Sequence, residues 1–139
     1  MIGVDEAGRG PVIGPLVVAA LAIPSEDIEI LSELNVKDSK DLSPNERLGI
    51  FTAINQRIED GKWKSGLILC SPKRIDINSL TSDLNSLEID LFSEAILATG
   101  LYLDSGVIRA DACDVNENRF RIRLQSSLGE KWKAWRIIA

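Results

Sequence analysis

Short apolar runs, each of strand length, recur along the chain between polar, turn-like segments. The first two runs are separated by a short segment with Gly8, Gly10 and Pro11. This composition predicts a tight turn and makes the two strands antiparallel neighbours. Five strands are expected in all, at residues 2–5, 15–23, 63–71, 106–111 and 132–139.

A helical spacing of apolar residues separates the later strands. Residues 44–59 carry apolar side chains at positions 48, 50, 51, 54 and 58, which predicts a helix. Its start is marked by Ser43 as the N-cap, Pro44 at the first helical position and Glu46 as the partner in a capping box.

Two further helices are predicted in the second half of the chain. One runs from residue 83 to about 99 and stops at Gly100, and the other covers residues 116–128 and ends at Gly129. The first has apolar positions at 84, 87, 91, 92, 95, 96 and 97, and the second places Phe120 and Leu124 on one face. Residues 25–35 are predicted to form a short acidic helix or a loop. Residues 71–77 are predicted to begin a loop or a short helix.

This order of elements predicts an α/β fold with a mixed sheet. A length of 139 residues corresponds to one domain, and 45% hydrophobic residues are enough for a core. No apolar run approaches the ~18 residues needed to span a bilayer. The start of the chain lacks the basic region of a secretory signal, so none is expected.

The composition limits the chemistry that the protein can carry out. The chain has no histidine, which excludes Ser-His-Asp triads and histidine zinc sites. Carboxylates and other oxygen ligands remain, and these favour Mg²⁺ or Mn²⁺. Cys70 and Cys113 lack the spacing of a metal site and are expected to be small buried apolar residues in a reducing, cytoplasmic setting.

Charge is unevenly distributed along the chain. The net charge is −5, which argues mildly against a nucleic-acid partner. Residues 101–139, however, carry seven Lys and Arg against five Asp and Glu, a local charge of +2. A local basic surface can bind phosphates on a protein whose total charge is negative.

Acidic residues stand at the ends of two of the predicted strands. Asp5 and Glu6 end the first strand, and Asp111 ends the strand at 106–111. If these strands are neighbours, the carboxylates converge at the sheet edge where α/β ligand sites gather, and a divalent cation would offset their repulsion. Adjacent Asp5 and Glu6 should point to opposite faces of a regular strand. Each acid could also be an ordinary strand-terminal residue, and spacing does not separate Asp111 from the nearby Asp104 and Asp114.

Two loops add candidate substrate contacts. Gly8 and Gly10 flank Arg9 in a turn whose backbone could approach a phosphate or a sugar hydroxyl, although a plain hairpin turn explains them too. Ser39 and Lys40 in "KDSK" could hold a backbone phosphate, or they belong to a solvated charged loop.

Four blocks of sequence, in order, resemble those of the ribonuclease HII family, most closely its archaeal members. They are "GVDEAGRGPVIGPLVVAA", "VKDSKDLSPNER", "LNSLE" and "VIRADACDVNENRF", and together they cover most of the chain. The type III enzymes resemble the chain less, because their first block departs from Gly-Arg-Gly.

The resemblance implies an RNase H-like fold with a central mixed sheet flanked by helices, C-terminally truncated here. It implies cleavage of RNA in RNA/DNA hybrids and on the 5′ side of single ribonucleotides in duplex DNA, leaving 3′-hydroxyl and 5′-phosphate ends. It also implies roles in ribonucleotide excision repair and DNA replication, no membrane association, a monomer when complete, and a sliding-clamp partner reached through the absent C-terminal part.

The resemblance also assigns roles to individual residues. Asp5, Glu6 and Asp111 would be the catalytic metal ligands for Mg²⁺ or Mn²⁺. Gly8, Arg9 and Gly10 would contact the 2′-hydroxyl that distinguishes RNA from DNA. Ser39 and Lys40 would contact phosphates of the substrate. Asn85 would lie near the nucleic acid.

The chain departs from the family pattern at its end. The family uses a fourth acid and a later tyrosine, yet no Asp or Glu follows Glu130, and Tyr102 precedes the third acid. Residues 1–139 are therefore expected to be an incomplete, N-terminal part of the catalytic domain, weakly active or inactive and marginally stable. The alternatives are a hybrid-binding module that does not cut and an actin-like phosphotransferase, and the latter lacks the expected glycine-rich phosphate loop.

Overall fold

The computed structural model describes residues 1–7, 16–36, 41–75, 84–111 and 116–139. These residues form two compact units, one of residues 1–22 and 65–139 and a smaller one of residues 23–64. The elements in chain order are β1 (Ile2–Ala7), β2 (Leu16–Ala22), α1 (Ile28–Glu33), α2 (Pro44–Glu59), β3 (Lys64–Cys70), α4 (Leu84–Ala98), β4 (Gly106–Ala110), α5 (Glu117–Leu128) and β5 (Trp135–Ile138).

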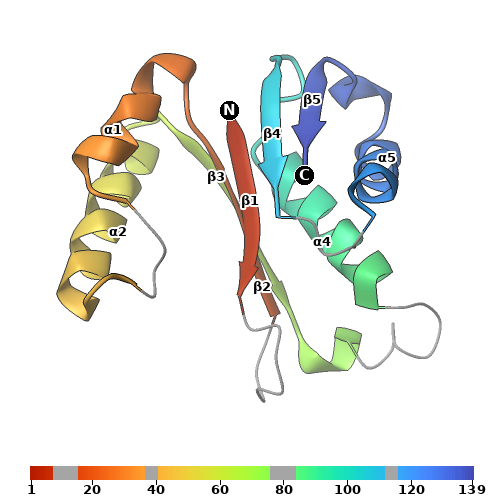
Figure 1. Ribbon diagram of the computed structural model, residues 1–139, viewed down its shortest axis with the longest axis horizontal. Coiled ribbons are helices and arrows are strands. Elements are labelled where there is room, and N and C mark those ends of the chain that lie inside the picture. Colours follow the sequence, from red (N-terminus) through yellow and green to blue (C-terminus); the bar gives the residue numbers. More distant parts are fainter. Residues whose placement is uncertain (8–15, 37–40, 76–83, 112–115) are drawn as a thin grey trace. The chain divides into compact units, whose positions relative to one another are not determined.

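The larger unit is built on a mixed five-stranded sheet with the strand order β3-β2-β1-β4-β5 (Figure 1). β1 and β2 pair in antiparallel fashion, with Ile2 opposite Ala22 and Ala7 opposite Val17, which confirms the predicted antiparallel pairing. β4 runs parallel to both β1 and β5. The predicted mixed α/β sheet is therefore confirmed, and β1 lies at its centre.

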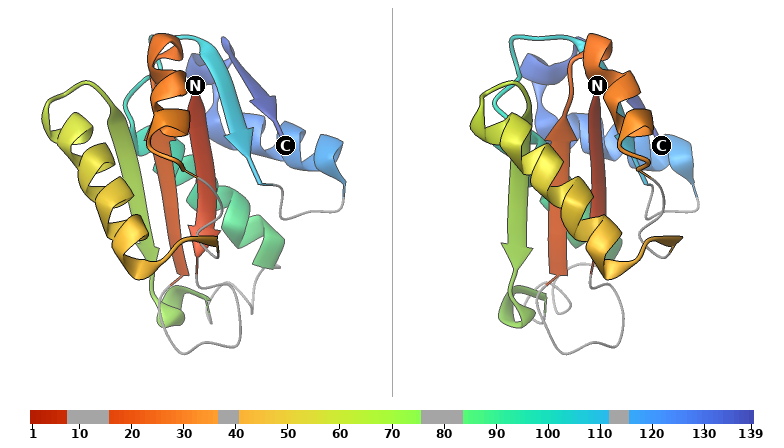
Figure 2. Two further views of the ribbon diagram at one scale, coloured as in Figure 1. Left: turned by 60° about the vertical axis from the view of Figure 1, so that its left-hand side comes forward. Right: turned by 90° about the vertical axis from the view of Figure 1, so that its left-hand side faces the viewer.

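Two helices of the larger unit, α4 and α5, supply the apolar layer that buries one face of the sheet. α4 packs against both β1 and β2, which it crosses in Figure 2. The rings of Phe92 on α4 and Phe120 on α5 meet edge to face, with centroids 6.0 Å apart. β3 approaches α4 so closely that a Cβ on Gly66 would lie 2.0 Å from the carbonyl oxygen of Ala95. Only glycine fits at this position without a shift of the backbone.

The first and last strands differ most from the sequence expectation. β1 continues through Asp5 and Glu6 to Ala7, so these acids lie within the strand rather than at its end. The last strand begins at Trp135, and a 3₁₀ turn at Glu130–Trp132 replaces its expected start. This turn allows Trp132 and Trp135 to be buried together, with ring centroids 5.8 Å apart, whereas residues three apart on one strand would face opposite sides.

The predicted apolar faces of two helices are only partly correct. On α4, residues 87, 91, 92, 95 and 96 are buried, but Leu97 is 44% exposed, because it lies about 200° around the helix from Ala95. On α2, Leu48 and Phe51 are exposed by more than 60%. The helix bounds themselves match the expectation to within two residues.

The smaller unit contains α1, α2 and the residues that connect them to the strands. Ser43 and Glu46 form the predicted capping box: Ser43 Oγ accepts from the Glu46 amide at 3.1 Å, and Glu46 Oε1 accepts from the Ser43 amide at 3.0 Å. Trp63 belongs to this unit rather than to the expected strand, and β3 begins after it. Its indole nitrogen donates to Asp27 at 3.0 Å, and the guanidinium of Arg57 lies 5.3 Å from the ring. In the described part of the chain, no helix combines the length and the apolarity needed to cross a membrane.

Candidate active site

Asp5 and Asp111 occupy corresponding positions on neighbouring parallel strands. The register of β1 and β4 pairs Gly3 with Arg109 and Val4 with Ala110, and the next residue on each side is an aspartate. Val4 and Ala110 are both buried on the helix-covered face, whereas Asp5 and Asp111 are exposed. Asp111 directly follows the last residue of β4, and continuing the alternation of strands about 4.8 Å apart by this one residue puts the two carboxylates on the opposite, open face as neighbours.

Glu6 lies on the other side of the sheet. It shares the face of Ile2 and Val4, and its Oε2 atom is buried, whereas Asp5 points to the open face. The regular strand therefore separates adjacent Asp5 and Glu6, as the alternation predicts. The backbone amide of Glu6 donates to Oδ1 of Asp5 at 2.8 Å, which orients the Asp5 carboxylate against its own strand.

The donor chemistry of this edge fits a hard divalent cation. Asp5 and Asp111 offer only oxygens and lie side by side, so a cation between them would relieve their repulsion. Among the residues that the structure describes, no three of the His, Cys, Asp or Glu type are grouped closely enough to hold a metal ion. The structure thus brings two of the three predicted ligands onto one face and leaves Glu6 on the other.

Other predicted site residues divide into those the structure places and those outside its description. Asp104 lies before β4 and hence at the opposite end of that strand from Asp111, which separates it from the site. Asn85 is in the first turn of α4, and its side chain is not described. The described ranges do not include Gly8, Arg9, Gly10, Ser39, Lys40, Cys113 or Asp114.

Two charged residues of the larger unit were not singled out by the sequence reasoning. Arg109 is exposed on β4, two residues before Asp111, and the alternation of "GVIRAD" could have placed both on one face. Glu88 on α4 is fully buried within the apolar layer. A signal was available, because residue 88 is four residues after Leu84 and four before Phe92, on the apolar side of the predicted helix.

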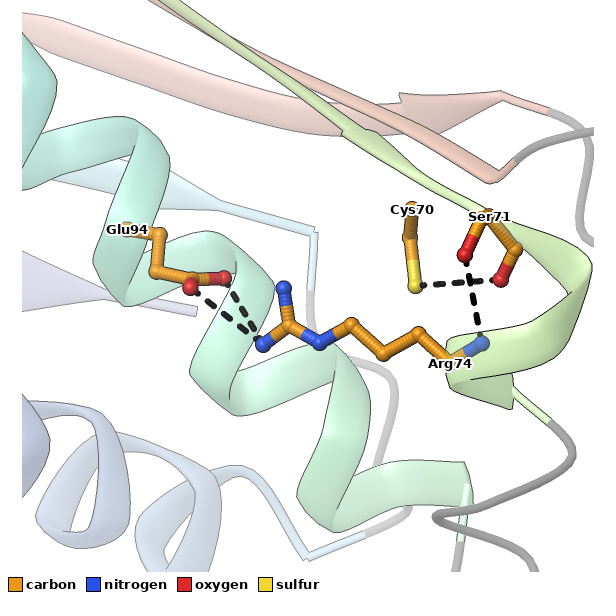
Figure 3. A network of polar contacts seen from close by, with 4 residues as sticks. All are labelled: Cys70, Ser71, Arg74 and Glu94. Atoms are coloured by element: carbon orange, nitrogen blue, oxygen red, sulfur yellow. Dashed lines mark hydrogen bonds and ion pairs between the residues drawn. The ribbon is translucent and has the colours of Figure 1, made fainter.

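A polar network at the end of β3 ties that strand to α4 (Figure 3). Arg74 reaches Glu94 with one guanidinium nitrogen, 3.2 Å from Oε1 and 3.1 Å from Oε2, and its backbone amide donates to Ser71 Oγ at 3.2 Å. Cys70 is fully buried beside this network, and burial raises the pKa of its thiol. Cys70 is therefore an inert core residue with a free thiol, as predicted.

The whole chain resembles proteins of one family. A family model described as Ribonuclease HII matches residues 2–137. The chain is 42% identical over 131 residues to ribonuclease HII of Pyrococcus furiosus, with 94% of this chain and 55% of that protein covered. It is 38% identical over 138 residues to the Thermococcus kodakarensis protein of the same name, with 95% and 57% covered. The chain thus spans a little over half the length of the curated relatives it matches.

Solved structures show the same fold. The structure of the PCNA:RNase HII complex from Archaeoglobus fulgidus superposes with a TM-score of 0.76 at 31% identity, covering 99% of this chain and 60% of that chain. A ribonuclease HIII structure in complex with Mn²⁺ superposes with a TM-score of 0.74 at 19% identity, covering 99% and 44%, and this likeness supports the fold alone. The predicted RNase H-like fold is confirmed.

Proposed function

The chain belongs to the ribonuclease HII family, and we propose that the complete protein is a divalent-metal-dependent endoribonuclease. Its substrates are RNA in RNA/DNA hybrids and single ribonucleotides in duplex DNA, cut on the 5′ side to leave 3′-hydroxyl and 5′-phosphate ends. The observation that carries this proposal is the placement of Asp5 and Asp111 as neighbours on the open face of the sheet.

The side chains at this edge divide the work of the reaction. Asp5 and Asp111 would hold Mg²⁺ or Mn²⁺, with Glu6 as a third ligand if the end of β1 bends toward the open face. A bound divalent ion supplies Lewis-acid stabilisation of the phosphate and an activated water. The amide of Glu6 restrains Asp5 before the metal binds, so less side-chain freedom is lost on binding.

Recognition of the ribose and of the flanking backbone is assigned to the two loops. Gly8, Arg9 and Gly10 would contact the 2′-hydroxyl, since that hydroxyl is what distinguishes RNA from DNA. Ser39 and Lys40 would hold phosphates, and Asn85 would lie near the nucleic acid. A sliding clamp, corresponding to the PCNA of the Archaeoglobus fulgidus complex, is the partner we propose for the complete protein, in the cytoplasm and in ribonucleotide excision repair and replication.

We further propose that residues 1–139 alone are weakly active or inactive. They supply Asp5, Glu6 and Asp111, whereas the fourth acid of the family pattern has no counterpart after Glu130. Among the described residues, the acids form no three-membered metal-binding group, which favours weak metal binding. The same lack of a three-membered acidic group among the described residues favours a second candidate function, a hybrid-binding module that does not cut.

The decisive experiment is cleavage of duplex DNA that contains one ribonucleotide, with Mg²⁺ or Mn²⁺. It is run on residues 1–139 and on the complete protein. We expect a specific cut 5′ of the ribonucleotide by the complete protein and little or none by residues 1–139. Hybrid binding without cutting by both proteins would favour the binding module, and robust cleavage by monomeric residues 1–139 would contradict the proposed impairment.

A further inference from the structure

Arg109 lies on the same open face of the sheet as the two aspartates. It precedes Asp111 by two residues on β4, and the register pairs it with Gly3, which precedes Asp5 by two residues on β1. Since Gly3 has no side chain and a Cβ there would meet nothing within 4 Å, the sheet beside Arg109 is open on the β1 side. Its Cα lies roughly 6.6 Å along the strand from that of Asp111.

Arg136 on β5 extends this arrangement to the next strand. The register pairs Arg136 with Val107, so it shares the face of Arg109 and Asp111, whereas Trp135 and Ile137 are buried toward the helices. Arg136 and Arg109 are diagonal neighbours, and both are exposed. Arg136, Arg109 and Asp5 therefore lie on one diagonal across the three parallel strands, and Asp111 lies beside Asp5.

Neither arginine is held by the rest of the described chain. No hydrogen bond or ion pair joins the guanidinium of Arg109 or Arg136 to a residue that the structure describes, although Asp5 and Asp111 are near Arg109. Both residues are anchored on strands, so their positions relative to the aspartates are fixed by backbone pairing. Two strand-borne guanidinium groups without a partner among the described residues, next to a candidate phosphodiester-cleaving site, suit an anionic ligand.

A second arginine, Arg121, lines the same surface hollow as Arg136. A hollow of about 310 Å³ opens between the end of β5 and the first turns of α5, and its lining includes Arg121 and Arg136. Asn118, held by Arg121 through a hydrogen bond, and Glu117 complete its polar wall. The hollow therefore places the guanidinium of Arg121 near Arg136, together with the carboxylate of Glu117.

We propose that Arg109 and Arg136 bind successive phosphates of the substrate strand that flanks the cleaved bond. This inference rests on the proposed function, because it takes the substrate to be a nucleic-acid duplex lying over Asp5 and Asp111. Such contacts fix the position and orientation of the duplex without reading its sequence, and the planar guanidinium can bind a phosphate with two hydrogen bonds. They also place positive charge on a protein whose net charge is −5.

The test is the salt dependence of duplex binding by the complete protein. Affinity for a duplex with one ribonucleotide is measured in EDTA at several salt concentrations for the parent, Arg109→Gln, Arg136→Gln and the double variant. Each lost phosphate contact should lower the slope of log affinity against log salt by about 0.9, and the double variant by about 1.8. Arg→Lys at both positions should restore most of the slope, because the charge returns.

Lys133→Gln is the matched control. It removes one positive charge from an exposed residue before the start of β5, at the far end of that strand from the aspartates. We expect its slope to equal that of the parent. An unchanged slope in the double variant, or an equal decrease in the control, overturns the proposal.

Cleavage assays on the same proteins keep the two hypotheses apart. With Mg²⁺, the arginine variants should show a raised KM and a kcat within about twofold of the parent, because the contacts act on binding rather than on the reacting atoms. If the parent cleaves the duplex but the arginine variants keep the parent's salt slope, only the arginine proposal is overturned. If the parent does not cut the duplex but the arginine variants show a reduced salt slope, only the proposed nuclease function is overturned.

Discussion

Asp5 and Asp111 each follow a residue of the same cross-strand pair, Val4 and Ala110, although 105 residues of chain separate them. Because β1 and β4 pair in parallel, the two aspartates are only one strand spacing apart. Each comes one residue after a buried residue, and the alternation of side chains therefore puts both carboxylates on the open face. Two carboxylates this close repel each other when both are charged and no cation is present. The arrangement therefore suits a bound cation better than it suits stability in the absence of one.

Asp5→Asn and Asp111→Asn should each abolish cleavage in the complete protein. Loss of an outer-shell partner of a metal ligand alone costs 10–100-fold, so loss of a ligand should cost at least about a hundredfold. Circular dichroism and thermal unfolding should show an intact fold, with Tm in EDTA equal to or above the parent, because one repelling charge is gone.

Asp104→Asn is the control for these variants. Asp104 lies at the other end of β4, so its replacement should leave the cleavage rate within about twofold of the parent. This change is much smaller than the ~100-fold loss expected for a metal ligand. If Asp111→Asn stays active and Asp114→Asn does not, the assignment of the third acid to Asp111 is wrong.

Gly66→Ala should destabilise the larger unit, whereas Gly49→Ala should stabilise α2. A Cβ on Gly66 would lie 2.0 Å from a backbone oxygen of α4, and overpacking of this kind costs about 1–3 kcal/mol. A Cβ on Gly49 meets nothing within 4 Å, and alanine is preferred to glycine within a helix by about 0.5–1 kcal/mol. Urea denaturation followed by circular dichroism measures both, and effects of equal sign would contradict the packing argument.

Local features of the fold could be predicted because their causes are local. The capping box of α2 depends on Ser43, Pro44 and Glu46, which are all within four residues, and the structure has it. The turn that replaces the start of the last strand depends on Trp132 packing against Trp135 in the core, and an alternating pattern of residues cannot show this.

The candidate site could be predicted only in part. Residue types and strand ends indicated the acids, but the pairing of β1 with β4 is a long-range contact that no local pattern specifies. The position of Arg109 follows from the same pairing: its parity with Asp111 was readable in the sequence, while its neighbour Gly3 was not.

Ser43→Ala should lower the stability of α2 by about 1 kcal/mol, because the amide of Glu46 loses its side-chain acceptor, whereas the bond from the backbone amide of residue 43 to Glu46 remains possible. Ser43→Asp should retain most of the stability, since aspartate caps helices equally well and suits the positive end of the helix dipole. Ser127→Ala, at an exposed position on α5, is the control and should change stability by less than about 0.5 kcal/mol. A loss in Ser43→Asp as large as in Ser43→Ala would contradict the capping role.

Cys70 should be unreactive in the folded protein and should make stability fall at high pH. Burial raises the pKa of its thiol, so the folded state keeps the proton at pH values where the unfolded chain releases it. The unfolded state then binds fewer protons, and the free energy of unfolding decreases as pH rises from about 8.5. Below that range the thiol is protonated in both states, and its contribution is constant.

Thiol labelling and urea denaturation test this in a Cys113→Ser background, where Cys70 is the one remaining cysteine. An aromatic disulfide reagent at pH 8 should label the native protein at least about a hundredfold more slowly than the urea-unfolded chain, because access requires opening of the core. Cys70→Ala in the same background lacks the thiol. Its free energy of unfolding should therefore decrease less between pH 8 and pH 10 than that of the protein with Cys70. Equal pH dependence in the two proteins, or rapid native labelling, would show that the thiol titrates as it does in water.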